Sequence, residues 1–451
     1  MSARALALAG VLVVSVSLIA WQSSPSPDPS VDRLIYTSTP EYNPLAWMQG
    51  GERFPHGATL YIGQGTSRRG LVSGFYASAD ANISFDGERV LFSGKRQVDK
   101  PWQVWEVTVA NGKVRQLTHC ADDCLSPFHL PAERFVYAHK VAGNFILETA
   151  SLEGGGGTLQ LSFGSGSFLP SDVLRDGRIL FQAAYTQDGK TSAELYTIYS
   201  DGSGVESYRC DHPGARHAGK QISSGDVVFV REGNLYRFTS PLAHDVAIAA
   251  PAGTYAGDVL ELQDGGWLVS WRAGKNFELR KWQPGSASLQ PQLAEPNANL
   301  IQPVWLASRP VPNRHPSGLH EWAYANVLCL NSSTSKYPFK DGSIASVRLY
   351  TRDAQGKAQI QGTTAVEKDG SFYLRVPGDL PLKIELLDGS GKTLKKESGW
   401  FWMRKGEQRI CVGCHAGPET SPENAVPEVL RRSINPADMS PTSGHATRGG
   451  K

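Results

Sequence analysis

The chain has 451 residues, of which 40% are hydrophobic, so it is long enough to bury one large core and a second, smaller one. Its formal net charge of +2 excludes the strongly basic surface with which proteins bind nucleic acid or acidic membranes. Six cysteines in a chain of this length exclude a small disulfide scaffold, and the abundant glycines and aromatic residues favour many short strands joined by tight turns.

The first element is an apolar run from Ala5 to Trp21, which follows Arg4 and precedes a stretch rich in proline and serine. This pattern is typical of a secretory signal, so residues 1–22 are predicted to be a signal peptide. A single membrane anchor is the competing interpretation, because the run approaches the roughly 20 residues that span a bilayer. Export predicts a periplasmic or secreted protein with no membrane contact beyond this segment.

An internal repeat follows. The segment SFDGERVLF at 84–92 has an Asp-Gly turn followed by a strand, and related segments occur at 130–138, 174–182, 223–230 and 262–271. Their turns lie about 40 to 50 residues apart, which is the spacing of four-stranded propeller blades. A single twisted sandwich is the alternative, but a period sustained over this length argues against it.

The two ends of the repeat region are predicted to build a sixth blade together. Strands are expected at 33–40 and 58–65, and a strand at 299–307 would return to close the ring. Closure is needed because an open blade would leave a bare sheet edge. Residues 31–309 are therefore predicted to form a six-bladed β-propeller.

From residue 310 the pattern changes to alternating strands and turns, and residues 310–433 are predicted to form a small antiparallel β domain. Residues 434–451, rich in Pro, Ser and Gly, are expected to be a disordered tail. The predicted fold class is thus all-β, a propeller followed by a β domain.

The β domain ends in ICVGCHAG at 410–417. The thiols of Cys411 and Cys414 can add to the two vinyl groups of one porphyrin, and the imidazole of His415 can then bind the iron. The pattern predicts one covalent haem c. A zinc site would need two further ligands at a similar spacing, and a plain disulfide would leave the histidine unexplained.

The second axial ligand of the iron stays open. His320 and His315 are candidates because they lie at the entrance to the same domain, and Met403 is close in sequence but stands in an apolar stretch typical of a core. A second His or a Met would give an electron-transfer centre, whereas a vacant position would bind a small ligand.

The other cysteines are less informative. Cys120 and Cys124 are close enough for a local disulfide, and a metal site with His119 or His129 is the minor alternative. Cys210 and Cys329 could pair or remain thiols.

In this order, the propeller, the β domain and CVGCH resemble the hydrazine synthase alpha subunit family, and the repeat phrases resemble those of TolB-like six-bladed propellers. The specific phrases are RHPSGLH, VLCLN and GTTAVEKDGSFYLRVPGDLPLKIELLDGSG, followed by SGWFWMRKGEQRICVGCHAGPETSPENAVP. The resemblance implies haem on Cys411, Cys414 and His415. The family's enzyme has a further domain with a second haem, and a Tyr where Glu419 stands here, so a single-haem relative is expected and hydrazine synthesis is not.

Together these patterns predict an exported monohaem protein that acts in electron transfer or as a redox subunit, with a redox partner protein and no nucleic acid. Two alternatives stay open. The chain could be a haem oxidoreductase on small nitrogen or oxygen compounds with an open iron position, or a propeller scaffold in which the haem is structural.

Overall fold

A computed structural model describes residues 33–63, 67–187, 190–209, 215–241, 243–335, 339–340, 342–353, 356–397, 399–413 and 425–439. Nearly all regular structure in these ranges is β, which confirms the all-β fold class. Within the same ranges, no helix has the length and apolar character needed to cross a membrane. The predicted signal peptide lies outside the described residues.

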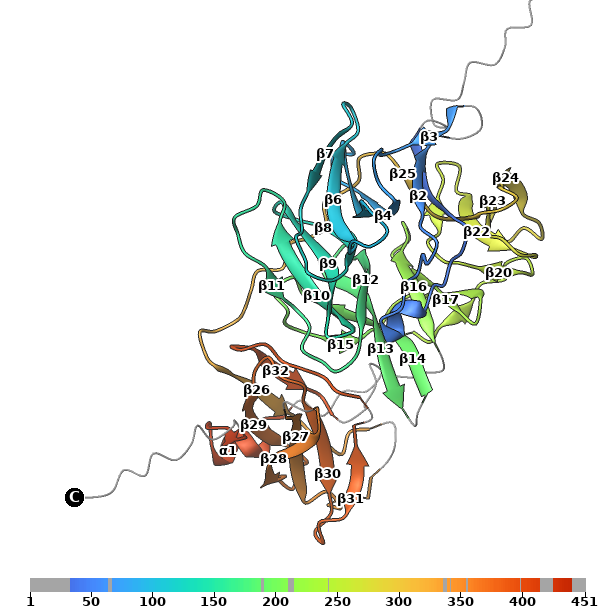
Figure 1. The fold of residues 1–451 in the computed structure, drawn as a ribbon. Helices are drawn as coiled ribbons and strands as arrows, with labels where there is room; N and C mark the ends of the chain where they lie inside the picture. The colour runs from blue at the N-terminus through green and yellow to red at the C-terminus, as the bar shows by residue number, and fades with distance from the viewer. Residues whose placement is uncertain are drawn as a thin grey trace, which may run out of the picture.

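Six sheets arranged in a ring form the propeller, coloured blue to yellow in Figure 1. Blade 1 has β25 (Asn299–Trp305), β1 (Leu34–Thr39), β2 (Thr59–Ile62) and β3 (Arg69–Gly70). Blade 2 has β4 (Ala77–Ile83), β5 (Arg89–Lys95), β6 (Gln103–Thr108) and β7 (Lys113–Gln116). Blade 3 has β8 (Cys124–Leu130), β9 (Arg134–Val141), β10 (Asn144–Ser151) and β11 (Leu159–Gln160).

The other three blades repeat the plan. Blade 4 has β12 (Phe168–Val173), β13 (Ile179–Gln187), β14 (Lys190–Ile198) and β15 (Glu206–Ser207). Blade 5 has β16 (Arg216–Gln221), β17 (Val227–Arg231), β18 (Asn234–Phe238) and β19 (Val246–Ala247). Blade 6 has β20 (Thr254–Tyr255), β21 (Leu260–Glu261), β22 (Trp267–Arg272), β23 (Glu278–Trp282) and β24 (Gln290–Leu293).

The Asp-Gly turns join β4 to β5 in blade 2, β12 to β13 in blade 4 and β21 to β22 in blade 6. At Asp86, Asp176 and Asp264 the carboxylate accepts the backbone N–H two residues later, and the glycine that follows each has a positive φ. This conformation is easy only for glycine, which explains why the dipeptide recurs at the same place in the repeat.

The ring closes between the first and last strands of the propeller. β25 pairs antiparallel with β1, from Leu34 opposite Trp305 to Thr39 opposite Asn299. The buried Asn299 reinforces the junction, since its side-chain N–H groups donate to Thr39 and Pro40 and its oxygen accepts the N–H of Phe277. The sixth blade predicted from the two ends of the repeat region is therefore confirmed.

Two sheets form the second part of the molecule, coloured orange to red in Figure 1. One has the order β32 (Gln408–Cys411), β26 (Tyr324–Cys329), β29 (Phe372–Pro377) and β33 (Ala437–Asp438), and the other β28 (Ala358–Ala365), β27 (Ser346–Arg352), β30 (Lys383–Leu387) and β31 (Thr393–Lys396). An apolar core lies between them, and a short helix α1 (Glu428–Arg432) precedes β33.

Two expectations for this part need correction. The sheet is not purely antiparallel, because β32 and β33 each join it parallel to their neighbours after long connections. The start of the segment 434–451, which is predicted to be disordered, is ordered as far as Met439, because β33 (Ala437–Asp438) pairs with β29 and Met439 is buried in the apolar core.

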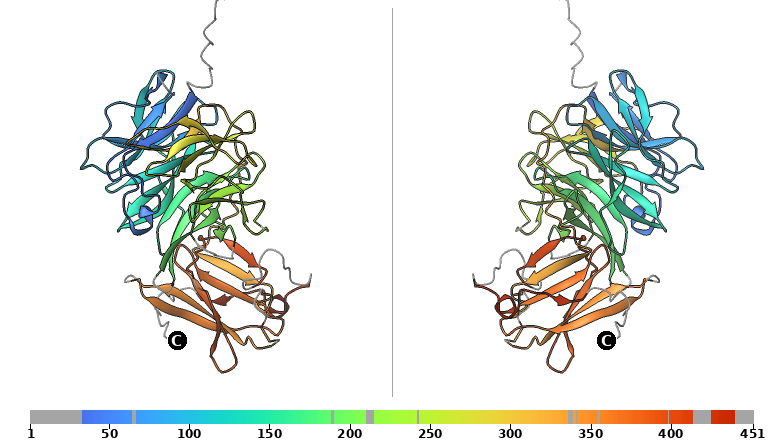
Figure 2. Two further views of the ribbon diagram at one scale, coloured as in Figure 1. Left: turned by 90° about the vertical axis from the view of Figure 1, so that its right-hand side faces the viewer. Right: turned by 90° about the vertical axis from the view of Figure 1, so that its left-hand side faces the viewer.

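Two consecutive side chains attach the second domain to the propeller. Trp402 is buried in the propeller, where its indole N–H donates to the Leu161 carbonyl at 3.0 Å and its ring packs against Phe168 and Gly164. The next residue, Met403, is fully buried in the core of the second domain. The second domain therefore lies against blades 3 and 4, as Figure 2 also shows.

Candidate functional site

The strand that leads into the CVGCH motif is β32, which lies at the edge of its sheet and pairs only with β26. Its last residue, Cys411, lies opposite Cys329 in the register, is half-buried and packs against the core of the sandwich. Cys414 and His415 lie outside the described residues, as does Cys210. The structure thus places the first thiol of the motif at an accessible sheet edge.

The surroundings of Cys411 fit a bound porphyrin. The neighbouring side chains of Ile410 and Val412 are apolar yet 66% and 39% exposed. Side chains alternate along a strand, so Ile410 lies on the face opposite Cys411, and Val412 follows the end of β32. The start of the motif therefore carries exposed apolar surface of the kind that a macrocycle attached nearby would cover. The donor set and its setting therefore suit a thioether-linked haem.

The two histidine candidates for the second axial position have other partners. The ring of His320 stacks on Trp322, with centroids 4.2 Å apart, and its Nε2 lies 3.0 Å from the amide nitrogen of Gln408. Gln408 and Cys411 are three residues apart on one strand, so their side chains point to opposite faces. His315 stacks on Tyr199 of the propeller, with centroids 3.8 Å apart.

Met403 has a different position. It is fully buried and belongs to the same apolar cluster against which Cys411 packs, which is true of neither histidine. The contacts of Met403 are those of a core residue, and it is the axial candidate that shares an apolar cluster with Cys411.

Cys120 and Cys124 are joined in a disulfide, with their Cα atoms 6.2 Å apart. Neither of the histidines named from the sequence lies with them, since His119 is exposed and the ring of His129 contacts Asn82. The histidine beside the two sulfurs is His139, because it is opposite Cys124 in the β8–β9 register.

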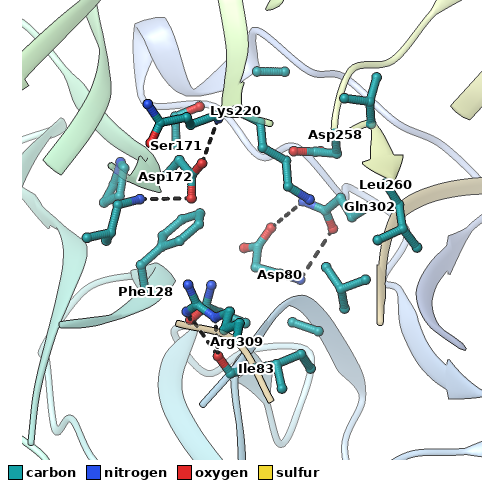
Figure 3. Close-up of a pocket in the computed structure, with 18 of the residues that line it drawn as sticks. Asp80, Ile83, Phe128, Ser171, Asp172, Lys220, Asp258, Leu260, Gln302 and Arg309 are labelled. Atoms are coloured by element: carbon teal, nitrogen blue, oxygen red, sulfur yellow. Dashed lines mark hydrogen bonds between the residues drawn. The ribbon is translucent and has the colours of Figure 1, made fainter. Parts of the chain in front are cut away.

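A cavity of about 760 Å³ runs through the propeller along the inner strands of the blades (Figure 3). The sequence patterns above do not predict the polar residues of this cavity. These residues include three carboxylates, each a few residues before the Asp-Gly turn of its blade, and this repeated offset could have revealed them. They are Asp80, Asp172 and Asp258.

Two of the carboxylates in the cavity, those of Asp80 and Asp258, have different surroundings and opposite pKa shifts. Asp80 accepts hydrogen bonds from Arg53, Ser93 and Gln302, at 2.6 to 2.7 Å. Burial alone would raise the pKa of this carboxyl, but these partners hold the pKa below its usual range. Burial raises the pKa of Asp258 to about 6, against the opposing effect of Lys220. Asp258 can therefore take up a proton near neutral pH.

The linker between the domains contributes a cation to the same cavity. Arg309 donates to the Ile83 carbonyl at 3.0 Å and lies over the ring of Phe85, and burial lowers the pKa of its guanidinium. Figure 3 shows Arg309 near Phe128 in the cavity.

Comparison with known proteins adds to this geometry. Residues 336–416 match the family described as the hydrazine synthase alpha subunit middle domain. Hydrazine synthase subunit alpha of Kuenenia stuttgartiensis is 36% identical over 58 residues, which is 13% of this chain and 7% of that protein's length.

The folds agree over a longer range. The solved structure of Kuenenia stuttgartiensis hydrazine synthase superposes with a TM-score of 0.78 at 16% identity, covering 89% of this chain and 72% of that chain. TolB from Acinetobacter baumannii gives a TM-score of 0.44 at 12% identity, over 62% of this chain and 67% of that chain.

Proposed function

We propose that this chain, which is a hydrazine synthase alpha-like protein, carries one c-type haem on Cys411, Cys414 and His415 and acts in electron transfer or as a redox subunit. The observation that carries the proposal is the setting of Cys411, a half-buried residue at the end of an edge strand, with exposed apolar residues before and after it in the sequence and with a second Cys three residues later and a His four residues later. A haem so attached would supply one-electron transfer.

The polypeptide's contribution is positioning. Trp402 and Met403 lie in two different cores, nine and eight residues before Cys411. They therefore fix where β32 begins relative to the propeller. A redox group needs a fixed distance to its partner, and a motif on a strand anchored in this way is held more rigidly than one on a loop. The propeller would then serve as the docking surface for a redox partner or a further subunit.

We also propose export to an oxidising compartment such as a periplasm. The N-terminal pattern of a charge, an apolar run and a Pro/Ser stretch supports it, and so does the Cys120–Cys124 disulfide, because such bonds persist mainly outside the cytosol.

A second function is favoured by one observation. Both histidine candidates for the second axial position are engaged elsewhere, His320 with Gln408 and His315 with Tyr199. If Met403 also stays in the core, the iron keeps an open position, and the chain would be a haem oxidoreductase on small nitrogen or oxygen compounds. Hydrazine synthesis is not part of this proposal.

The test is haem incorporation in the exported full-length chain, produced together with a haem-attachment system. We expect a haem stain that survives a denaturing gel and an intact mass increased by one haem. The variant C411A/C414A should lose both signals, whereas C120S/C124S, which removes two cysteines outside the motif, should keep them. A colourless parent chain with the mass of the bare polypeptide would refute the proposal.

The optical spectrum distinguishes the two functions. A low-spin ferrous spectrum that carbon monoxide does not change supports the electron carrier, and its loss in M403L would assign the axial ligand. A high-spin form that binds carbon monoxide supports the oxidoreductase.

A further inference from the structure

A second cluster of metal-ligating side chains lies on blade 3. The ligand atoms of Cys120, Cys124 and His139 all lie within 4.8 Å of one another, with the two sulfurs joined in the disulfide. Two thiolates and one imidazole are a donor set that Zn²⁺ prefers. The cluster thus offers this donor set once the disulfide is reduced.

Backbone hydrogen bonds hold the loop 120–124 independently of the disulfide. The N–H of Cys120 donates to the side-chain oxygen of Gln103 at 2.9 Å, and the side-chain N–H of Gln103 donates back to the Cys120 carbonyl at 3.0 Å. The N–H of Cys124 donates to the Trp102 carbonyl, while Asp123 accepts the N–H of Trp102. The Cα positions of both cysteines are therefore set by contacts that remain when the sulfur–sulfur bond is broken.

A carboxylate holds the imidazole of His139. Nδ1 of His139 lies 3.1 Å from Oε2 of Glu148, and the same oxygen accepts the hydroxyl of Tyr137 at 2.7 Å. A carboxylate beside Nδ1 favours the tautomer with the proton on Nδ1, which leaves the lone pair of Nε2 available. This pairing of carboxylate and histidine is the usual support of a zinc-bound imidazole.

We propose that Cys120, Cys124 and His139 form a redox-gated zinc site. A dithiol delivers two electrons and two protons to the disulfide, which becomes two thiols while the dithiol becomes a disulfide. Zn²⁺ then binds the two sulfurs and Nε2 of His139, and the two thiol protons are released to solvent. The His139 side chain is 23% exposed, so water can take the fourth position.

The test uses the full chain with C411A/C414A, so that the thiols of CVGCH cannot bind zinc. The protein is prepared oxidised or reduced with a phosphine, and Zn²⁺ is titrated against a chromophoric chelator. We expect one Zn²⁺ per reduced chain above the binding of the oxidised chain. Co²⁺ in place of Zn²⁺ should give a thiolate-to-cobalt charge-transfer band only after reduction.

Three variants define the ligands. H139A should abolish the tight binding, and E148Q should weaken it by roughly 10- to 100-fold, as expected for a carboxylate that supports a metal-bound imidazole. The control is H119A, which removes the exposed histidine next to Cys120 and should bind as the parent does. If the reduced parent binds no more Zn²⁺ than the oxidised protein, or if H139A binds as tightly as the parent, the proposal is wrong. The oxidised-to-reduced comparison needs no substitution at the site, so it remains valid if a variant fails to fold.

Discussion

The pKa of Asp258, in the cavity of the propeller, is set by the surroundings of its carboxyl. Its carboxyl faces a cavity that also holds Lys220, Asp172 and the Arg53–Asp80 pair, and burial raises its pKa from 3.8 to about 6. Between these two values the folded chain binds a proton that the unfolded chain releases. The free energy of unfolding therefore falls as the pH rises from 4 to 6, and it stays lower above pH 6.

Replacing Asp258 with Asn should remove this penalty. At pH 7 we expect D258N to be more stable than the parent by up to about 3 kcal/mol, the free energy of a shift of roughly two pKa units. The gain should shrink as the pH falls toward 4 and disappear below 3.8, where the carboxyl is protonated in the unfolded state as well. Denaturant midpoints measured across this pH range check the prediction, and a gain that does not change with pH would contradict it.

At the scale of elements, the closure of the ring depends on β25. This strand comes some 260 residues after β1 in the sequence, yet it forms the inner strand of the first blade. Leu300 is fully buried there with Leu34, Tyr36, Leu268 and Leu279, which belong to the first and last blades. The contact joins the two ends of the propeller, so a defect in it affects the whole ring.

Leu300→Ala should therefore lower the free energy of unfolding by about 2 to 5 kcal/mol, as expected for a buried leucine whose site cannot collapse. The control is Val246→Ala on the outermost strand β19, where the valine is 48% exposed and the change should stay within about 0.5 kcal/mol. Chemical unfolding of the two variants gives the comparison. Equal losses would show that closure by β25 does not limit stability.

At the scale of the whole molecule, the indole of Trp402 is a central contact between the two domains. Trp402 leaves its own domain and fills a site in the propeller, and Arg404 supports it by donating to the Gln160 carbonyl. Gly164 leaves room for the ring, because a Cβ there would lie 2.8 Å from it. The orientation of β32, and with it the proposed haem site, follows from this contact.

Trp402→Ala should cost about 3 to 5 kcal/mol and free the linker between the domains, making it sensitive to a protease. Trp400→Ala is the matched control, since Trp400 is only half-buried and contacts Arg352 and Lys383 within its own domain. Thermal unfolding and limited proteolysis report the two effects. If both variants behave alike, the domains are held together by other contacts.

The sequence by itself determined the repeating part of the structure. The Asp-Gly turns and the strand pattern depend on a few neighbouring residues, so their spacing predicted the blades, and the unpaired strands at the two ends predicted the closure between β1 and β25. The position of CVGCH after a β domain was likewise readable, because the motif is contiguous.

The tertiary structure alone decided which distant side chains meet. The neighbour of the disulfide is His139, not His119 or His129, because the register of β8 and β9 places His139 opposite Cys124. Trp402 packs in the propeller, whereas Met403 and Met439 pack in the core of the second domain. The physical reason is that turn and strand preferences act over a few residues, whereas burial and register are set by contacts between segments that only the folded chain brings together.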